Sequence, residues 1–158
     1  MTETEIKLDD TRIQLEMAMS KENITKIDVV RSCINAFISN ARSVTFTMQK
    51  ESGSSDKFAK WYKGRQEEMK SNPLLKFFNE QRVISIHQQS VRPNQRFVNI
   101  TKVEQGGHLV GTGGTVMTYE FEGFSKIVRG DSGNVFRLCK QYYTYMQQLV
   151  NDWLKVMK

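Results

Sequence analysis

An unbroken apolar stripe between about residues 25 and 50 constrains this chain more than any other feature. Hydrophobic side chains recur there every three or four residues, the spacing at which side chains share one face of an α-helix. The stripe consists of Ile27, Val30, Ile34, Phe37, Ala41, Val44 and Met48. A helix of this length with a continuous apolar face needs other elements to cover it. The sequence therefore predicts a domain built around a core helix at residues 25–50.

Three further segments have a helical pattern of apolar residues: 57–71, 73–92 and about 132–157. Asn72 and Pro73 suit the cap and the first turn of the 73–92 helix. Pro93 disfavours helical geometry in the residue before it, so this helix is expected to end by about Arg92.

Residues 1–23 allow two interpretations. Ile13, Leu15, Met17 and Met19 alternate with polar residues, which is typical of a strand, but the segment from Leu8 to Met19 also tolerates a helix. The pattern does not decide between them.

After Pro93 the composition changes. Residues 95–103 and 115–124 are short, β-branched and aromatic, and a glycine-rich loop separates them, which predicts a β-hairpin at about 95–124. The chain is long enough for one domain with its own core. We therefore expect a mainly α fold: an antiparallel four-helix bundle spanning residues 1–158 as a single domain, with the hairpin inserted before the last helix.

The net charge of +6 is concentrated in one part of the chain. Between residues 57 and 102 there are ten basic side chains and three acidic ones, a net charge of +7. Such a patch is compatible with binding RNA or another polyanion, and equally with a soluble basic protein that binds no nucleic acid. The candidate nucleic-acid-binding residues in this region are Lys60, Lys63, Arg65, Lys76 and Arg92.

The remaining composition excludes several classes of site. Cys33 and Cys139 both fall on apolar helical stripes, which predicts buried free thiols, and together with two histidines they lack the spacing of metal ligands. We therefore predict no metal site and no cofactor. The first ten residues do not resemble a signal peptide, and no apolar run approaches the roughly 20 residues that span a bilayer. A cytoplasmic location away from membranes is the expectation.

Two glycine-containing motifs resemble known functional motifs, but the residues around them do not fit those functions. The glycines Gly106 and Gly111 have the spacing of a phosphate-binding loop, but Thr112 occupies the lysine position. The tetrapeptide at residues 130–133, GDSG, resembles the nucleophile motif of trypsin-like proteases, but that fold needs a longer all-β chain. We expect Asp131 or Ser132 to cap the last helix instead.

Arg82 is the strongest functional candidate because it interrupts an apolar stripe, and His87 follows it five residues later. A guanidinium beside an imidazole suits RNA cleavage without a metal: the imidazole takes a proton from the ribose 2′-OH and the arginine stabilises the charge on the phosphate. In one ideal helix the two side chains would face different directions. They converge only if the helix ends near His87 or if a second copy faces the first. The structural alternative is an arginine bound to a core carboxylate or carbonyl and a histidine capping the helix end.

The segment from Arg82 to His87, an R-x4-H pattern on the third of the four expected helices, resembles the HEPN superfamily of small helical bundles. The stretches 37–51 and 61–82 are also similar to a set of uncharacterised bacterial proteins. The HEPN resemblance implies a metal-independent endoribonuclease or RNA-binding protein of a bacterial toxin or defence system. It further implies Arg82 as the phosphate contact, His87 as the acid/base, a homodimer and a possible antitoxin partner. The alternative function is a non-catalytic helical module that binds a nucleotide or a partner protein.

Overall fold

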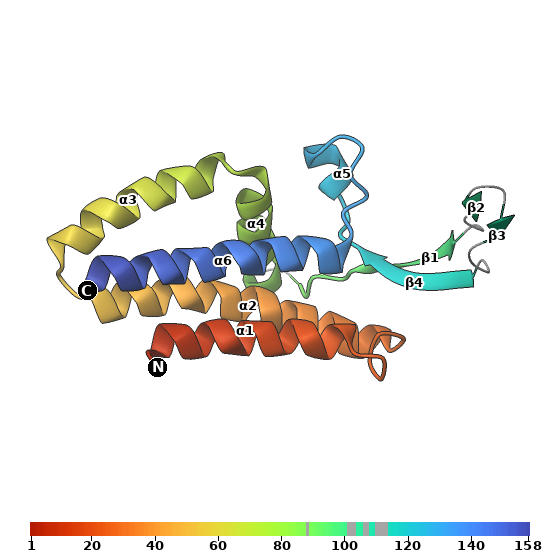
Figure 1. Ribbon diagram of the computed structural model, residues 1–158, viewed down its shortest axis with the longest axis horizontal. Helices are drawn as coiled ribbons and strands as arrows, with labels where there is room; N and C mark the ends of the chain where they lie inside the picture. The colour runs from red at the N-terminus through yellow and green to blue at the C-terminus, as the bar shows by residue number, and fades with distance from the viewer. Residues whose placement is uncertain (88, 101–103, 106–107, 110–113) are drawn as a thin grey trace.

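The long apolar stripe forms α2 (Ile27–Ser52), the central helix of the computed structural model, which describes residues 1–87, 89–100, 104–105, 108–109 and 114–158 (Figure 1). The members of the stripe are buried from Val30 to Met48, whereas Ile27, at the first turn, is 43% exposed. The prediction of a core helix is therefore confirmed.

Helix α1 (Glu3–Met19) lies along α2 (Figure 1) and settles the two interpretations of the N-terminal segment. Its buried side chains follow a spacing of four and three residues: Thr4, Leu8, Thr11, Leu15 and Ala18. Ile6, Ile13 and Met17 lie on the roughly opposite face and are exposed. Because apolar residues occupy two faces and two threonines occupy the buried one, no single apolar stripe was visible in the sequence.

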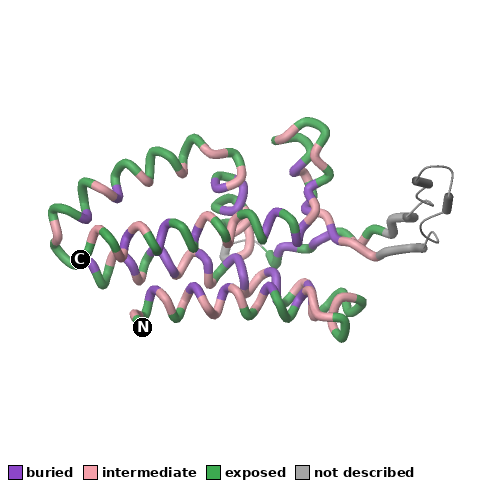
Figure 2. The backbone as a smooth tube through the Cα atoms, in the orientation of Figure 1, coloured by how far each residue is buried: buried purple, intermediate pink, exposed green. Residues whose placement is uncertain are grey.

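Helix α6 (Val135–Met157) completes this layer and lies beside α2 and α1 (Figure 1). Its buried residues include Leu138, Leu149 and Trp153, as the stripe predicted. Figure 2 shows the buried positions on the surfaces that α1, α2 and α6 turn toward one another. Cys33 and Cys139 are free and buried, and burial raises the pKa of both thiols. In the described part of the chain, no helix has the length and apolar character that a membrane crossing requires.

On the other side of this layer, α4 (Pro73–His87) packs against α2 and α6, and α3 (Asp56–Ser71) packs against α4 and α6. Asn72 caps α4 as predicted, because its Oδ1 accepts the N–H groups of Leu74 at 3.0 Å and Leu75 at 3.3 Å. Along its course α3 diverges from α6, and most of its side chains are exposed (Figures 1 and 2). The expected four-helix bundle is not confirmed: three helices form a layer, α3 arches over it, and α4 crosses it steeply (Figure 1).

Helix α4 ends at His87, several residues before the expected limit at Arg92. Asn35, on α2, holds the chain that follows. Its Oδ1 accepts the Val91 N–H at 2.8 Å and the Ser85 hydroxyl at 3.0 Å, and its Nδ2 donates to the Val91 carbonyl at 2.8 Å. A side chain distant in sequence thus draws the backbone out of the helix before Pro93 can act.

The hairpin projects from the end of the layer at which α6 begins (Figure 1). Strand β1 (Asn94–Ile100) pairs antiparallel with β4 (Gly114–Glu120), with Asn94 opposite Glu120. Between them, β2 (Glu104–Gln105) pairs with β3 (His108–Leu109), where a loop was expected. The rest of the glycine-rich stretch lies outside the described residues. The Tyr119 hydroxyl donates to the Ile24 carbonyl at 2.7 Å and fastens the hairpin to the α1–α2 connection.

The connection from β4 to α6 contains a short helix, α5 (Phe124–Ile127), which the sequence did not predict, because the second strand was expected to continue to residue 124. The GDSG turn closes this connection. Gly133 has a φ of +74°, and a Cβ there would lie 2.8 Å from the Phe124 Cβ, so only glycine fits. The cap of α6 is Asn134, whose Oδ1 accepts the Arg137 N–H at 2.9 Å. The prediction of Asp131 or Ser132 as the cap is therefore wrong.

Replacement of Asn35 by alanine is expected to lower the free energy of unfolding by about 2 kcal/mol, because the Val91 amide and carbonyl lose their partners. Urea unfolding measures the change. Asn40→Ala on the same helix is the matched control, since the described part of the chain gives that half-buried side chain no hydrogen bond. Equal effects of the two substitutions would contradict the role of Asn35.

Glu51 makes the stability of α1 depend on pH. Its carboxylate, at the end of α2, accepts the N–H groups of Glu3 at 2.9 Å and Thr4 at 3.1 Å, the first amides of α1. Burial raises the pKa of Glu51, but these bonds and one from the Thr4 hydroxyl outweigh burial and hold the pKa below its usual value of 4.5. A depressed pKa stabilises the fold above the unfolded pKa, and the contribution is lost as the pH falls through the folded value.

We therefore expect Glu51→Gln to flatten the loss of stability between about pH 5 and 3. Urea unfolding at several pH values measures it. Glu22→Gln, at an exposed position for which the described residues provide no hydrogen bond, is the control and should follow the wild-type curve. A variant at Glu51 that kept the wild-type acid dependence would show that this cap is unimportant.

Candidate functional site

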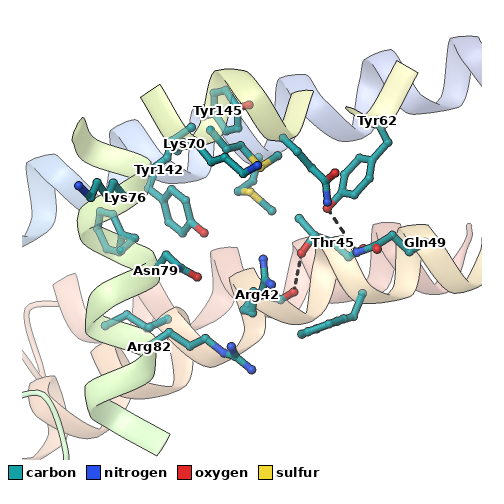
Figure 3. A pocket seen from close by; sticks show the side chains of 17 residues that line it. Arg42, Thr45, Gln49, Tyr62, Lys70, Lys76, Asn79, Arg82, Tyr142 and Tyr145 are labelled. Atoms are coloured by element: carbon teal, nitrogen blue, oxygen red, sulfur yellow. Dashed lines mark hydrogen bonds between the residues drawn. The ribbon is translucent and has the colours of Figure 1, made fainter. Parts of the chain in front are cut away.

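A cavity of about 590 Å³ opens between α2, α3, α4 and α6 (Figure 3). Small-molecule sites in proteins commonly enclose about 300–1,000 Å³. Apolar side chains form part of its wall: Ile38, Phe46, Met69, Leu75, Phe78 and Met146. The cavity is therefore large enough for a small organic ligand and has an apolar wall on which such a ligand can rest.

Four cationic side chains line the cavity, and no carboxylate is among its lining residues. They are Arg42 from α2, Lys70 from α3, and Lys76 and Arg82 from α4. The Lys70 ammonium forms an ion pair at 2.9 Å with Glu67, which is not among the lining residues. The guanidinium carbons of Arg42 and Arg82 lie 4.7 and 5.7 Å from the centroid of the Phe46 ring. The local potential is therefore positive, and it attracts anions.

Neutral hydrogen-bonding groups share the same cavity: Thr45, Gln49, Tyr62, Gln66, Asn79, Tyr142 and Tyr145. Gln49 Nε2 donates to the Thr45 carbonyl at 2.9 Å and to the Tyr62 hydroxyl at 3.3 Å. Burial raises the pKa of Tyr142 and of Tyr145 to about 12. Both phenols are consequently neutral at physiological pH and able to donate a hydrogen bond.

Two buried polar atoms of this cavity have no hydrogen-bond partner in the described part of the chain: Nε of Arg42 and the hydroxyl of Tyr145. A buried donor without an acceptor costs about 1–3 kcal/mol, and more when the group is charged. Native proteins rarely leave such groups unpaired unless the site has another use. Arg42 and Tyr145 both line the cavity, so these two unsatisfied groups belong to its wall.

The spacing of residues on two helices explains how the cavity forms. On α2, one side of the buried stripe carries Ile38, Arg42, Thr45 and Gln49, at intervals of four, three and four residues. The same intervals place Leu75, Asn79 and Arg82 together on α4. Because α3 buries only Phe58 and Tyr62 and diverges from α6, it leaves these faces uncovered.

The structure brings together only part of the predicted site. Arg82 and Lys76 line the cavity. Lys60, Lys63 and Arg92 are exposed and do not line it, and Arg65 is tied to Asp152 at 2.8 Å and to Glu68 at 2.9 Å. His87 is the last residue of α4, and its side chain lies outside the described residues, so its convergence with Arg82 stays a prediction.

Sequence reasoning missed most of the cavity. Arg42 had no assigned role; it follows Ala41 directly at the edge of the apolar stripe of α2, and this position was the available signal. Tyr142 and Tyr145 were interpreted only as apolar positions of the last helix. Their hydroxyl groups could not be assigned to a cavity without knowing where α4 crosses α6.

A comparison with known protein families shows which part of this site lies within a family match. A sequence model described as bacteriophage lambda protein ea47 matches residues 8–99, more than half of the chain. This chain belongs to the Ea47 family. The matched segment includes α2, α3 and α4, which supply three walls of the cavity, and it stops before α6. Searches of curated proteins and of solved structures gave no match.

Membership of the Ea47 family overturns the HEPN resemblance, which is wrong. The resemblance depended on an arginine and a histidine five residues apart on a helix, and a pattern of only two residues arises by chance in unrelated helices. The homodimer, the antitoxin partner and the catalytic roles of Arg82 and His87 were implied by that resemblance and lose its support.

Two tyrosines of the cavity allow a matched test of the unpaired hydroxyl. Tyr145→Phe is expected to raise the free energy of unfolding by about 1 kcal/mol, because it removes a buried hydroxyl without a partner. Tyr62→Phe is expected to lower it by about 1 kcal/mol, because the Gln49 amide loses an acceptor. Urea unfolding of both variants measures the difference. Comparable destabilisation by the two substitutions would show that Tyr145 is not an unpaired group.

Proposed function

We propose that this member of the Ea47 family is a non-catalytic module that binds a phosphate-bearing ligand, a nucleotide or the phosphates of RNA, in the cavity between α2, α3, α4 and α6. The observation that carries the proposal is the cavity's charge: among the described residues it is lined by four cationic side chains and no carboxylate, and one of them, Arg42, carries a buried Nε without a hydrogen-bond partner there.

Phosphate suits this arrangement because it supplies several acceptor oxygens and up to two negative charges. Arginine binds phosphate through paired N–H groups, and hydrogen bonds to charged partners are about twice as strong as neutral ones. Arg42 and Arg82 reach the cavity from different helices, and their guanidinium carbons lie 4.7 and 5.7 Å from the centroid of the same Phe46 ring, which favours an anion shared by the two. The neutral hydroxyl of Tyr145 would supply a further donor.

The lining residues argue for binding over catalysis. Among the described residues the lining includes no histidine, cysteine, aspartate or glutamate, and burial raises the pKa of Tyr142 and of Tyr145 to about 12. A general base works best when its pKa lies near the working pH. Cleavage of RNA by Arg82 with His87 stays a separate prediction.

Binding of AMP and of a short fluorescently labelled single-stranded RNA, each in EDTA, tests the proposal. Arg42→Gln is expected to weaken binding roughly ten- to hundredfold, since a hydrogen bond to a charged group contributes about 1.5–3 kcal/mol. Lys60→Gln is the matched control: it also removes one basic charge, but from an exposed position on α3 that does not line the cavity. Calorimetry for AMP and fluorescence anisotropy for RNA provide the affinities.

Three outcomes would contradict the proposal. Wild-type protein could bind neither AMP nor RNA, or Lys60→Gln could weaken binding as much as Arg42→Gln does. The third is the appearance of 2′,3′-cyclic phosphate ends in the RNA, lost in Arg82→Ala and in His87→Ala, which would show a ribonuclease. Thermal melting of each variant separates a lost contact from a lost fold.

A further inference from the structure

The cavity has two chemically different ends (Figure 3). At one end, α4 presents Lys76, Asn79 and Arg82. At the other end, α2 and α3 present Gln49 and Tyr62, which are uncharged. Arg42 lies between the two groups in the same view. A ligand that satisfies both ends must therefore carry an anionic group and, at some distance from it, a polar neutral group.

The separation of the ends follows from helix geometry. Arg42 and Gln49 are seven residues apart on α2, which places their backbones about 10 Å apart along the helix axis. This is comparable to the length of one extended nucleoside monophosphate from phosphate to base. Apolar residues, among them the half-exposed Phe46, also line the cavity and can contact a sugar or a flat ring.

The neutral end is organised to recognise a base edge. Gln49 Nε2 is committed to the Thr45 carbonyl and to the Tyr62 hydroxyl, so the Gln49 amide is held in one orientation. Its Oε1 receives no donor within the described part of the chain and is available as an acceptor. The Tyr62 hydroxyl accepts a bond from Gln49 and also lies within hydrogen-bonding reach of the Thr45 side chain, so it donates to a ligand when its proton is turned away from Thr45. A nucleobase edge carries a donor and an acceptor side by side, the complement of this pair.

We infer that the cavity takes a single nucleotide with a terminal phosphate, its phosphate on Arg42 and Arg82 and its base on Gln49 and Tyr62. This inference rests on the proposed function and adds the ligand class and its orientation. Gln49 is then a specificity-determining residue: it contacts the base and has no contact with the phosphate. Inorganic phosphate should bind at the α4 end alone, and a nucleoside without phosphate should bind poorly.

Calorimetry with AMP, CMP, GMP, UMP, adenosine and inorganic phosphate tests the inference on wild type, Gln49→Met and Arg82→Gln. We expect at least one monophosphate to bind about tenfold or more tightly than phosphate and adenosine. Gln49→Met should remove that preference and leave the affinity for inorganic phosphate within about twofold. Arg82→Gln should weaken the binding of the monophosphate and of inorganic phosphate alike. Tyr62→Phe, which keeps the ring and removes the donor, provides a second variant if Gln49→Met does not fold.

The outcomes separate this inference from the proposed function. If phosphate or RNA binds through Arg42 but every monophosphate binds no more tightly than phosphate, the single-nucleotide site is refuted and the phosphate-binding module stands. Equal weakening of AMP and phosphate by Gln49→Met would likewise refute the orientation. If phosphate, the monophosphates and RNA all fail to bind the folded wild type, both proposals fail.

Discussion

Burial of the α2 stripe is the interaction on which the rest of the structure depends. Helix α1 packs along one side of the α2 stripe, and α6 and the first half of α4 cover the rest of that stripe. The cluster around Ile34 and Phe37 joins residues of α1, α4, β4 and α6. Each of those elements packs against part of α2. A helix surrounded in this way has few positions that can hold a charged side chain. Arg42 therefore has to lie at the border of the covered surface.

The cavity follows from the way α3 is attached. This helix places Phe58 and Tyr62 against a second cluster near the ends of α2 and α6, and Arg65 adds an ion pair to Asp152 of α6. Beyond those contacts α3 leaves α6 and continues to the cap at Asn72 (Figure 1). The space beneath it is bounded by well-packed helices on the other sides, so the cavity is fixed in shape by the core and open only because α3 does not fill it. Unpaired donors in such a space reduce stability, a cost that proteins commonly accept at functional sites.

The sequence predicted those elements that are determined by residues within a single segment of the chain. The structure confirms the apolar stripes of α2 and α6 and the start of α4 at Asn72 and Pro73. Each of these features depends only on neighbouring residues. The end of α4 at His87 agrees with the predicted limit at Arg92, but its position within that limit could not be predicted, because Asn35, more than 50 residues earlier in the chain, binds the segment that follows the helix. Helix α1 stayed undecided because threonines occupy its buried face and isoleucines its exposed one. In both cases the missing information was the identity of the packing partner.

The candidate site shows the same division between local and distant information. Arg82 was recognisable because a cation interrupts an apolar stripe, but its partner was sought five residues along the same helix. In the structure, Arg82 instead shares its surroundings with Arg42, forty residues earlier: both guanidinium groups lie near the ring of Phe46, and both residues line one cavity. Each arginine alone resembles a misplaced charge in a helix. Considered together, at the junction of two helices that leave a space between them, the two arginines supply the positive charge on which the proposed anion site depends.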